Sequence, residues 1–155
     1  MIRVTGVLAA TAVVGAVWAA PLPVTDPFLP GTRWQGELTQ KGVFGGGAVG
    51  PPAFRAVLTV TVRDGDRFEA DLAERSEELQ VTYHVKGMIV PGADGKGFAV
   101  RFRSTGASGA VNTAPILGVH YDGVLTGRTV RGAWRVPTNP EGTSVEGGFR
   151  LELAK

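Results

Sequence analysis

The chain of 155 residues contains no cysteine, and this absence excludes several kinds of chemistry. Without thiols there is no disulfide bond, no cysteine nucleophile and no sulfur ligand for a metal ion. Histidine is scarce as well, with two residues in the whole chain, which leaves little material for an imidazole metal site. We therefore expect no metal site and no cofactor.

A large excess of charge of one sign is also missing. The 16 basic residues stand against 14 acidic ones, and twelve of the basic residues are arginines that alternate with other residues along the chain. A nucleic-acid-binding protein usually concentrates basic residues in a patch, because phosphate contacts dominate its affinity. We expect no nucleic-acid partner and interpret the arginines as the solvent-facing side of a sheet.

A helical hydrophobic period is absent from residue 31 to the end of the chain. Hydrophobic residues still make up 43% of the sequence, which is enough for one domain with a real core. The 23 glycines and 10 prolines separate short alternating segments, a pattern typical of many short strands joined by turns. The composition therefore favours a single all-β domain.

The longest uncharged stretch lies at the N-terminus, where residues 4–20 follow an arginine. It ends in small residues before Pro21, which is the pattern of a secretory signal peptide. Cleavage after Ala19 places small residues at the recognition positions, so we predict a signal peptide over residues 1–19. The alternative is an uncleaved anchor, since the run lies at the lower limit of a membrane-spanning length.

The remainder of the chain divides into two parts. Residues 20–30 form a proline-rich lead-in, expected to be extended and outside the core, and residues 31–155 form the domain. The predicted location is secreted or periplasmic, with no integral membrane segment after cleavage. The alternative location is a membrane surface, reached through the uncleaved N-terminal segment.

The clearest local pattern is a β-hairpin over residues 119–136, VHYDGVLTGRTVRGAWRV. A glycine in the first central position of its turn suits a type II′ turn, which fixes the register of the two strands. Counting outward, this register pairs Tyr121 with Trp134 and Gly123 with Gly132 on one apolar face. Because an isolated hairpin is marginal in water, this face must be covered by more sheet.

Alternation of apolar and polar residues predicts eight strands in all. Most are joined to the next by short connections, so we expect an antiparallel meander that closes on itself and removes both sheet edges. The predicted fold is an all-β, eight-stranded antiparallel up-and-down barrel. A β-sandwich is the alternative, because alternation does not distinguish closure from stacking. The strands are predicted at about 32–40, 53–63, 67–73, 78–90, 97–103, 118–126, 129–136 and 145–153.

Several features together resemble the lipocalin and avidin group of small barrels, the calycins. They are the signal-peptide pattern, a first strand built around GTRWQG at residues 31–36, the meander of strands, and a tryptophan spaced by glycine at residues 132–134. The resemblance covers about residues 31–153. It implies a small closed barrel.

The predicted inward positions are apolar or glycine, with no Asp, Glu, His, Lys or Arg among them. A catalytic interior needs at least one titratable group close to substrate, so we expect a non-enzymatic barrel. Aromatic residues with polar tips are the best candidates to line a small-molecule cavity, although they also suit plain core packing. These candidate ligand-binding residues are Trp34, Tyr83, Tyr121 and Trp134.

His120 and Asp122 lie together on the polar face of the hairpin, where a metal or acid–base pair is conceivable. The register places Asp122 diagonal to Arg131 and Arg135. We therefore interpret these residues as a surface charge ladder.

Two connections carry apolar residues where solvent exposure is expected. Val43 and Phe44 lie in a glycine-rich connection, and Ile116 and Leu117 lie in a long one. Either pair could form a lid or contact a partner. The sequence thus favours a barrel that binds a small apolar ligand at its mouth or interior. The alternative is a filled barrel that serves as an envelope interaction or scaffold module; the oligomeric state is left open.

Overall fold

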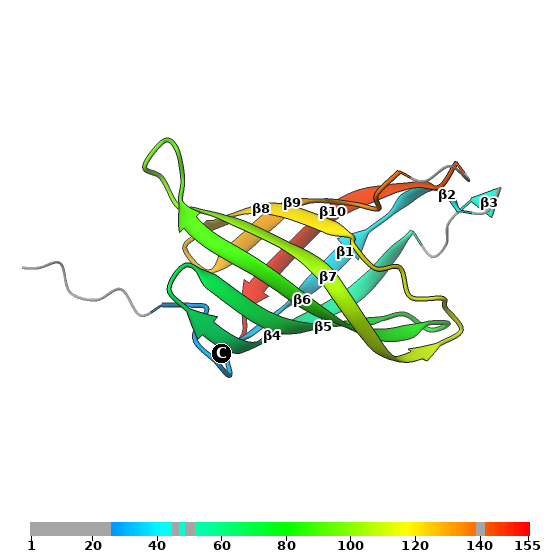
Figure 1. The fold of residues 1–155 in the computed structure, drawn as a ribbon, viewed down its shortest axis with the longest axis horizontal. Coiled ribbons are helices and arrows are strands. Elements are labelled where there is room, and N and C mark those ends of the chain that lie inside the picture. The colour runs from blue at the N-terminus through cyan, green and yellow to red at the C-terminus, as the bar shows by residue number, and fades with distance from the viewer. Residues whose placement is uncertain (1–25, 45–46, 49–51, 139–141) are drawn as a thin grey trace, which may run out of the picture.

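The computed structural model describes residues 26–44, 47–48, 52–138 and 142–155. The predicted signal peptide, residues 1–19, and residues 20–25 of the lead-in lie outside the described residues. Every regular element of the described part is a β-strand, and Figure 1 shows the strands wrapping around one long axis. No helix in these residues has the length and hydropathy to cross a membrane.

Eight strands form a closed antiparallel barrel in up-and-down order. They are β1 (Arg33–Thr39), β4 (Ala53–Asp64), β5 (Arg67–Arg75), β6 (Gln80–Pro91), β7 (Phe98–Val111), β8 (His120–Thr126), β9 (Thr129–Arg135) and β10 (Ser144–Leu153). Each pairs with the next in this series, and β1 pairs with β10, where Trp34 lies opposite Leu153. This closing pair confirms the predicted barrel, and the sandwich alternative is wrong.

Two short strands lie beside the meander. β2 (Lys41–Phe44) follows β1 and pairs with β10, and β3 (Gly47–Ala48) pairs back with β2. The glycine-rich pattern predicts an irregular connection here, and this prediction is wrong for both segments. Glycine makes the pairing possible, because a Cβ on Gly42 would lie 1.8 Å from the Ser144 carbonyl oxygen.

The hairpin of β8 and β9 has the predicted register. Tyr121 lies opposite Trp134, and Gly123 lies opposite Gly132. The ring of Phe149 fills the space beside Gly123, where its Cζ would lie 2.8 Å from an added Cβ. Gly123 therefore allows close packing of an aromatic ring from β10.

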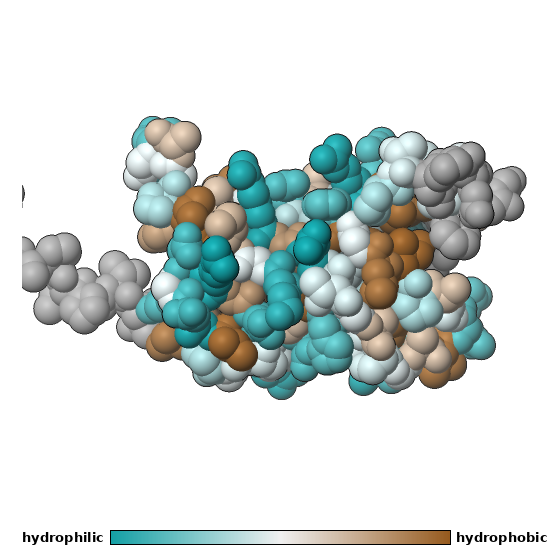
Figure 2. Space-filling model, viewed as in Figure 1, coloured by the Kyte–Doolittle hydropathy of each residue, from teal (hydrophilic) through white to brown (hydrophobic). Residues whose placement is uncertain are grey.

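The strands separate a dry interior from a polar outer wall. Inward residues such as Leu58, Leu72 and Val100 are fully buried, and Lys86 and Arg103 on the outer side of the same sheet are exposed. Figure 2 shows hydrophilic side chains over the middle of the wall formed by β6 and β7, with apolar ones toward both ends. This alternation is what the sequence predicts for most positions.

The two ends of the barrel differ. Short turns join β4 to β5 and β8 to β9 at one end, which we call the closed end. The connections that follow β7 and β9 are longer and lie at the opposite end, which we call the mouth (Figure 1). In an up-and-down barrel alternate connections lie at the same end, so a difference in connection length becomes a difference between ends.

Phe28 fills the closed end. Its side chain is fully buried, and its ring centroid lies 5.1 Å from that of Trp34 and 5.0 Å from that of Phe68. Trp34 Nε1 donates a hydrogen bond to the Pro27 carbonyl oxygen at 3.2 Å. The expectation that the lead-in lies outside the core is therefore wrong for Phe28, because a segment without strand pairing can still fold its one aromatic ring into the barrel.

Some strand ends and faces also differ from the expectation. β5 continues past its predicted end at residue 73 to include Glu74, and β7 continues past residue 103 to include Ser104. Both polar residues keep the alternation of their strands and are buried inside the barrel. A β-bulge between Val60 and Val62 turns Val62, expected to face inward, to solvent with 46% of its surface exposed.

Candidate functional site: a cavity at the barrel mouth

A cavity of about 320 Å³ lies at the mouth of the barrel, and most of the residues that line it are apolar. Small-molecule sites in proteins usually measure about 300 to 1,000 Å³, so this cavity is at the lower end of that range. Its apolar lining includes Phe54, Val81, Val119, Trp134, Val136 and Val145.

One carboxyl group belongs to this cavity. Glu74 is 6% exposed, and its Oε1 accepts a hydrogen bond of 3.2 Å from the Tyr121 hydroxyl. Its neighbours across the sheet are Ala56 on β4 and Val81 on β6, which bring no charge. The alternation pattern predicts no ionisable residue at an inward position, and Glu74 shows that this prediction is wrong.

Burial raises the pKa values of the three titratable side chains in the cavity. Removal from water raises the pKa of Glu74 from 4.5 to about 7, although the hydrogen bond from Tyr121 lowers it. Burial likewise raises the pKa of the Tyr121 hydroxyl well above its ordinary value, and the charge of Glu74 raises it further. Burial and then the Glu74 charge also raise the pKa of Tyr83, against a hydrogen bond from the Ile116 backbone. Near neutral pH the two hydroxyls are therefore neutral and the carboxyl is close to its midpoint.

The connection between β7 and β8 is held across the mouth by hydrogen bonds. Ser104 Oγ donates to the Ile116 carbonyl oxygen at 3.3 Å and accepts from the Val119 backbone N–H at 3.0 Å. The Ile116 backbone N–H donates to the Tyr83 hydroxyl at 3.4 Å. Buried Ser104 and Tyr83 thus fix Ile116 at the rim of the cavity.

Three of the four candidate ligand-binding residues meet at this cavity. Tyr83, Tyr121 and Trp134 line it, and the ring centroids of Tyr121 and Trp134 lie 6.3 Å apart. Trp34 lies instead at the closed end, packed against Phe28. Alternation identifies the inward face of each strand, but it does not say at which end of the barrel a residue lies.

The four candidate lid residues are distributed differently. Ile116 lines the cavity and packs against the core, whereas Leu117 turns outward and is 50% exposed. Val43 in β2 is also exposed and does not line the cavity. Phe44 ends β2, and its side chain lies outside the described part of the structure. The neighbouring strand β3 contributes Ala48 to the lining.

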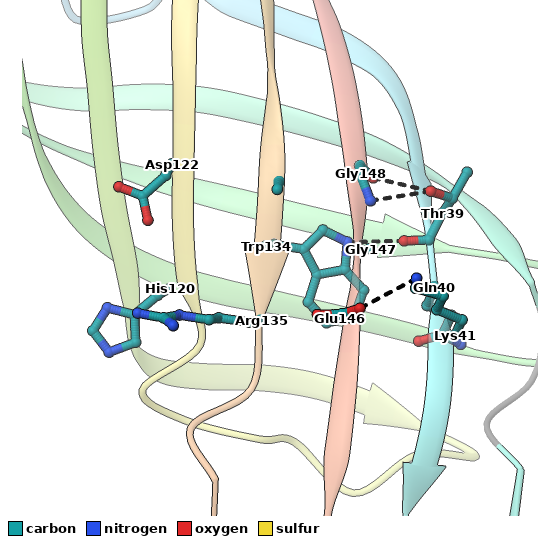
Figure 3. A pocket seen from close by; sticks show the side chains of 11 residues that line it. Thr39, Gln40, Lys41, His120, Asp122, Trp134, Arg135, Glu146, Gly147 and Gly148 are labelled. Atoms are coloured by element: carbon teal, nitrogen blue, oxygen red, sulfur yellow. Dashed lines mark hydrogen bonds and ion pairs between the residues drawn. The ribbon is translucent and has the colours of Figure 1, made fainter.

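A second hollow, of about 510 Å³, lies on the outer face of β9 and β10 (Figure 3). It forms where Ala133 and Gly148 carry little or no side chain. Figure 3 shows the indole of Trp134 reaching β1, where its Nε1 donates to the Thr39 carbonyl oxygen at 2.9 Å. The backbone N–H of Gly148 donates to Thr39 Oγ1 at 3.1 Å. Trp134 therefore lines both hollows and separates them.

Three of the charged side chains that line the outer hollow, Lys41, Asp122 and Glu146, form ion pairs. Lys41 Nζ lies 3.2 Å from Glu146 Oε1, and Asp122 Oδ1 lies 3.2 Å from Arg101 Nε. Asp122 thus belongs to a surface charge ladder, with Arg101 of β7 as its partner in place of the arginines on β9. His120 lines the same hollow and is exposed. These exposed pairs explain the polar rim without a ligand.

Within the described ranges, no three His, Asp or Glu side chains gather closely enough to hold a metal ion. The mouth cavity is therefore the candidate site, with Glu74 as its charged group and Tyr83 and Tyr121 as its hydroxyls. Comparison of the sequence with models of known protein families and with curated proteins gives no match.

Proposed function

We propose that this protein is a non-enzymatic barrel that binds a small, largely apolar ligand in its mouth cavity. The observation that carries the proposal is the contrast between a closed end filled by Phe28 and a mouth with a cavity of about 320 Å³. An apolar lining with a few convergent polar groups is typical of a ligand site. Here the polar residues of the lining are Glu74, Tyr83 and Tyr121, together with Gln40 and Thr113.

The chemistry of the lining favours binding over catalysis. Glu74, with a pKa of about 7, has the ionisation of a general acid or base. The two tyrosines beside it keep their protons, because burial and the Glu74 charge raise the pKa of both hydroxyls. The described lining contains no lysine, histidine or serine to act as a nucleophile or second base. A carboxyl and two neutral hydroxyls suit the orientation of a bound molecule.

Titration with the neutral apolar dye N-phenyl-1-naphthylamine tests this proposal. Its fluorescence should rise on binding to the folded protein. Ile116→Trp fills the rim of the cavity and should weaken dye binding by at least about tenfold. Leu117→Trp adds the same side chain one residue further on, at an exposed position, and should leave dye affinity within about twofold.

The alternative function, a filled interaction module, predicts a different result. Such a protein would give no saturable rise in dye fluorescence. A rise that is equally affected by both tryptophan variants would place the dye outside the cavity and also contradict the proposal.

We further propose that the barrel is exported after cleavage of residues 1–19. The support is the uncharged run at residues 4–20 and the small residues that precede Pro21. Intact-mass measurement of protein recovered from a secreting bacterial host should give a chain that begins at Ala20. A full-length chain recovered with the membrane fraction would instead support the uncleaved anchor.

A further inference from the structure

The described lining of the mouth cavity contains an acidic residue but no basic one. Glu74 is its acidic group, and the described lining residues include no lysine, arginine or histidine. The titratable groups that face Glu74 are Tyr121 from β8 and Tyr83 from β6. On the remaining walls, β4 brings Phe54 and β9 brings Trp134, which carry no charge. The chain thus places a carboxyl group in an apolar cavity without a cationic partner.

A carboxylate in such a place is poorly compensated. Burial penalises the charged form, and one hydrogen bond from Tyr121 at 3.2 Å offsets only part of that penalty. Burial accordingly raises the pKa of Glu74 to about 7. A cation that enters the cavity would supply the missing compensation, because opposite charges attract more strongly away from water.

The rest of the lining also suits an organic cation. Aromatic rings attract ammonium groups, and Tyr83, Tyr121 and Trp134 line the same cavity as Glu74. Aliphatic residues such as Val119 and Val145 form apolar wall for a hydrocarbon body. An inorganic cation would gain little from these apolar and aromatic walls, whereas an amine with an apolar body gains from both parts of the cavity.

We propose that the mouth cavity binds a small organic amine, with its protonated nitrogen against the Glu74 carboxylate and its apolar body against the aromatic and aliphatic wall. This inference rests on the proposed function and adds the chemical class of the ligand to it.

Tryptamine and tryptophol test the inference, because they share an indole-ethyl body and differ in an ammonium or a hydroxyl group. Each is titrated by calorimetry into the mature protein at pH 8. Tryptamine should bind at least about tenfold more tightly than tryptophol. Glu74→Gln should remove most of this preference by weakening tryptamine, while tryptophol changes by less than about threefold. Glu77→Gln, in an exposed connection, is the matched control and should leave both affinities unchanged.

A second measurement on the unaltered protein needs no variant to fold. Between pH 6 and pH 8 Glu74 loses its proton, whereas tryptamine stays protonated and both tyrosines stay neutral. Tryptamine affinity should therefore rise with pH, by at least about threefold. Tryptophol affinity should not rise, since a charged carboxylate gives it no new attraction.

The outcomes separate the two proposals. Equal affinity for the two ligands, or a tryptamine affinity that does not rise with pH, overturns the amine inference. If N-phenyl-1-naphthylamine still binds and is blocked by Ile116→Trp, the proposed function stands. If neither the dye nor either indole binds, both proposals fail.

Discussion

The closed end and the mouth are built from the same eight strands, yet their interiors differ. At the closed end the ring of Phe28 packs against those of Trp34 and Phe68, with centroid distances of 5.1 and 5.0 Å. At the mouth Tyr121 and Trp134 border a cavity that also contains the buried carboxyl of Glu74. The closed end contributes packing to stability, whereas the mouth gives up packing and keeps a group that destabilises the fold when it ionises. Functional sites commonly lower the stability of the fold in this way.

The largest expected effect comes from comparing tryptophans at the two ends. Trp34→Ala removes a fully buried ring and should lower the free energy of unfolding by about 3 to 5 kcal/mol. Trp134→Ala should cost less, about 2 to 3 kcal/mol, because part of its ring already borders a cavity. Urea denaturation of both variants measures the difference. Equal losses would mean that the mouth is packed as tightly as the closed end.

The next effect concerns Glu74 alone. Its pKa is 4.5 unfolded and about 7 folded, so between these values the folded state binds more protons than the unfolded state. Stability should therefore fall as pH rises from about 4.5 to above 7, by about 3 kcal/mol in total. Glu74→Gln should abolish most of this loss.

Urea denaturation at pH 5 and pH 8 checks this expectation. The stability of Glu74→Gln relative to the unaltered protein should be greater at pH 8 than at pH 5. Glu77→Gln is the control, since an exposed carboxyl should leave the pH dependence unchanged. The same pH dependence in Glu74→Gln and the unaltered protein would show that Glu74 does not ionise inside the barrel.

The strands of the barrel could be predicted because the patterns that specify them lie within single strands and the turns between neighbouring strands. Alternation identifies the inward face of each strand, and the short turn at residues 127–128 fixes the register that pairs Tyr121 with Trp134. Short connections between most strands predict an antiparallel meander, whereas closure is established by the pairing of β1 with β10. The β-bulge at Val62 was not predictable in this way, because one extra residue changes the face without changing the pattern.

The candidate site could be predicted only in part. The strand predictions omit two of its buried polar residues for the same reason. Glu74 follows Phe68, Ala70 and Leu72 at the same spacing of two, and Ser104 follows Phe102. In both cases a polar residue suggests the end of the strand, although the backbone continues and the polar side chain points inward. The spacing was the signal that could have identified them. Which residues share an end of the barrel depends on the closed structure, so Trp34 was grouped with residues of the mouth.

The third effect tests how the lead-in holds the closed end. Asp26 Oδ2 accepts from Arg63 Nε at 2.9 Å, and its Oδ1 accepts from the Phe28 backbone N–H at 2.8 Å. Asp26→Ala should lower the free energy of unfolding by about 1 to 3 kcal/mol, because it leaves a largely buried guanidinium without this partner. Thermal denaturation measures the loss. Unchanged stability would indicate that Phe28 is held by packing alone.

The smallest effect should come from a matched ion pair on the outer wall, away from both ends. Asp122 lies 3.2 Å from Arg101, as an aspartate–arginine pair like Asp26 and Arg63, but its side chains are 60% and 68% exposed rather than 31% and 16%. Water screens exposed charges, and ordering two mobile side chains offsets much of their attraction, so Asp122→Ala should cost no more than about 1 kcal/mol.

Thermal denaturation of the two aspartate variants in low and high salt compares them directly. Salt should reduce the small Asp122 effect and leave most of the Asp26 effect, because the latter pair is partly removed from water. If Asp122→Ala were as damaging as Asp26→Ala, the outer wall would contribute to stability through its charges, and burial would not determine how much each ion pair contributes.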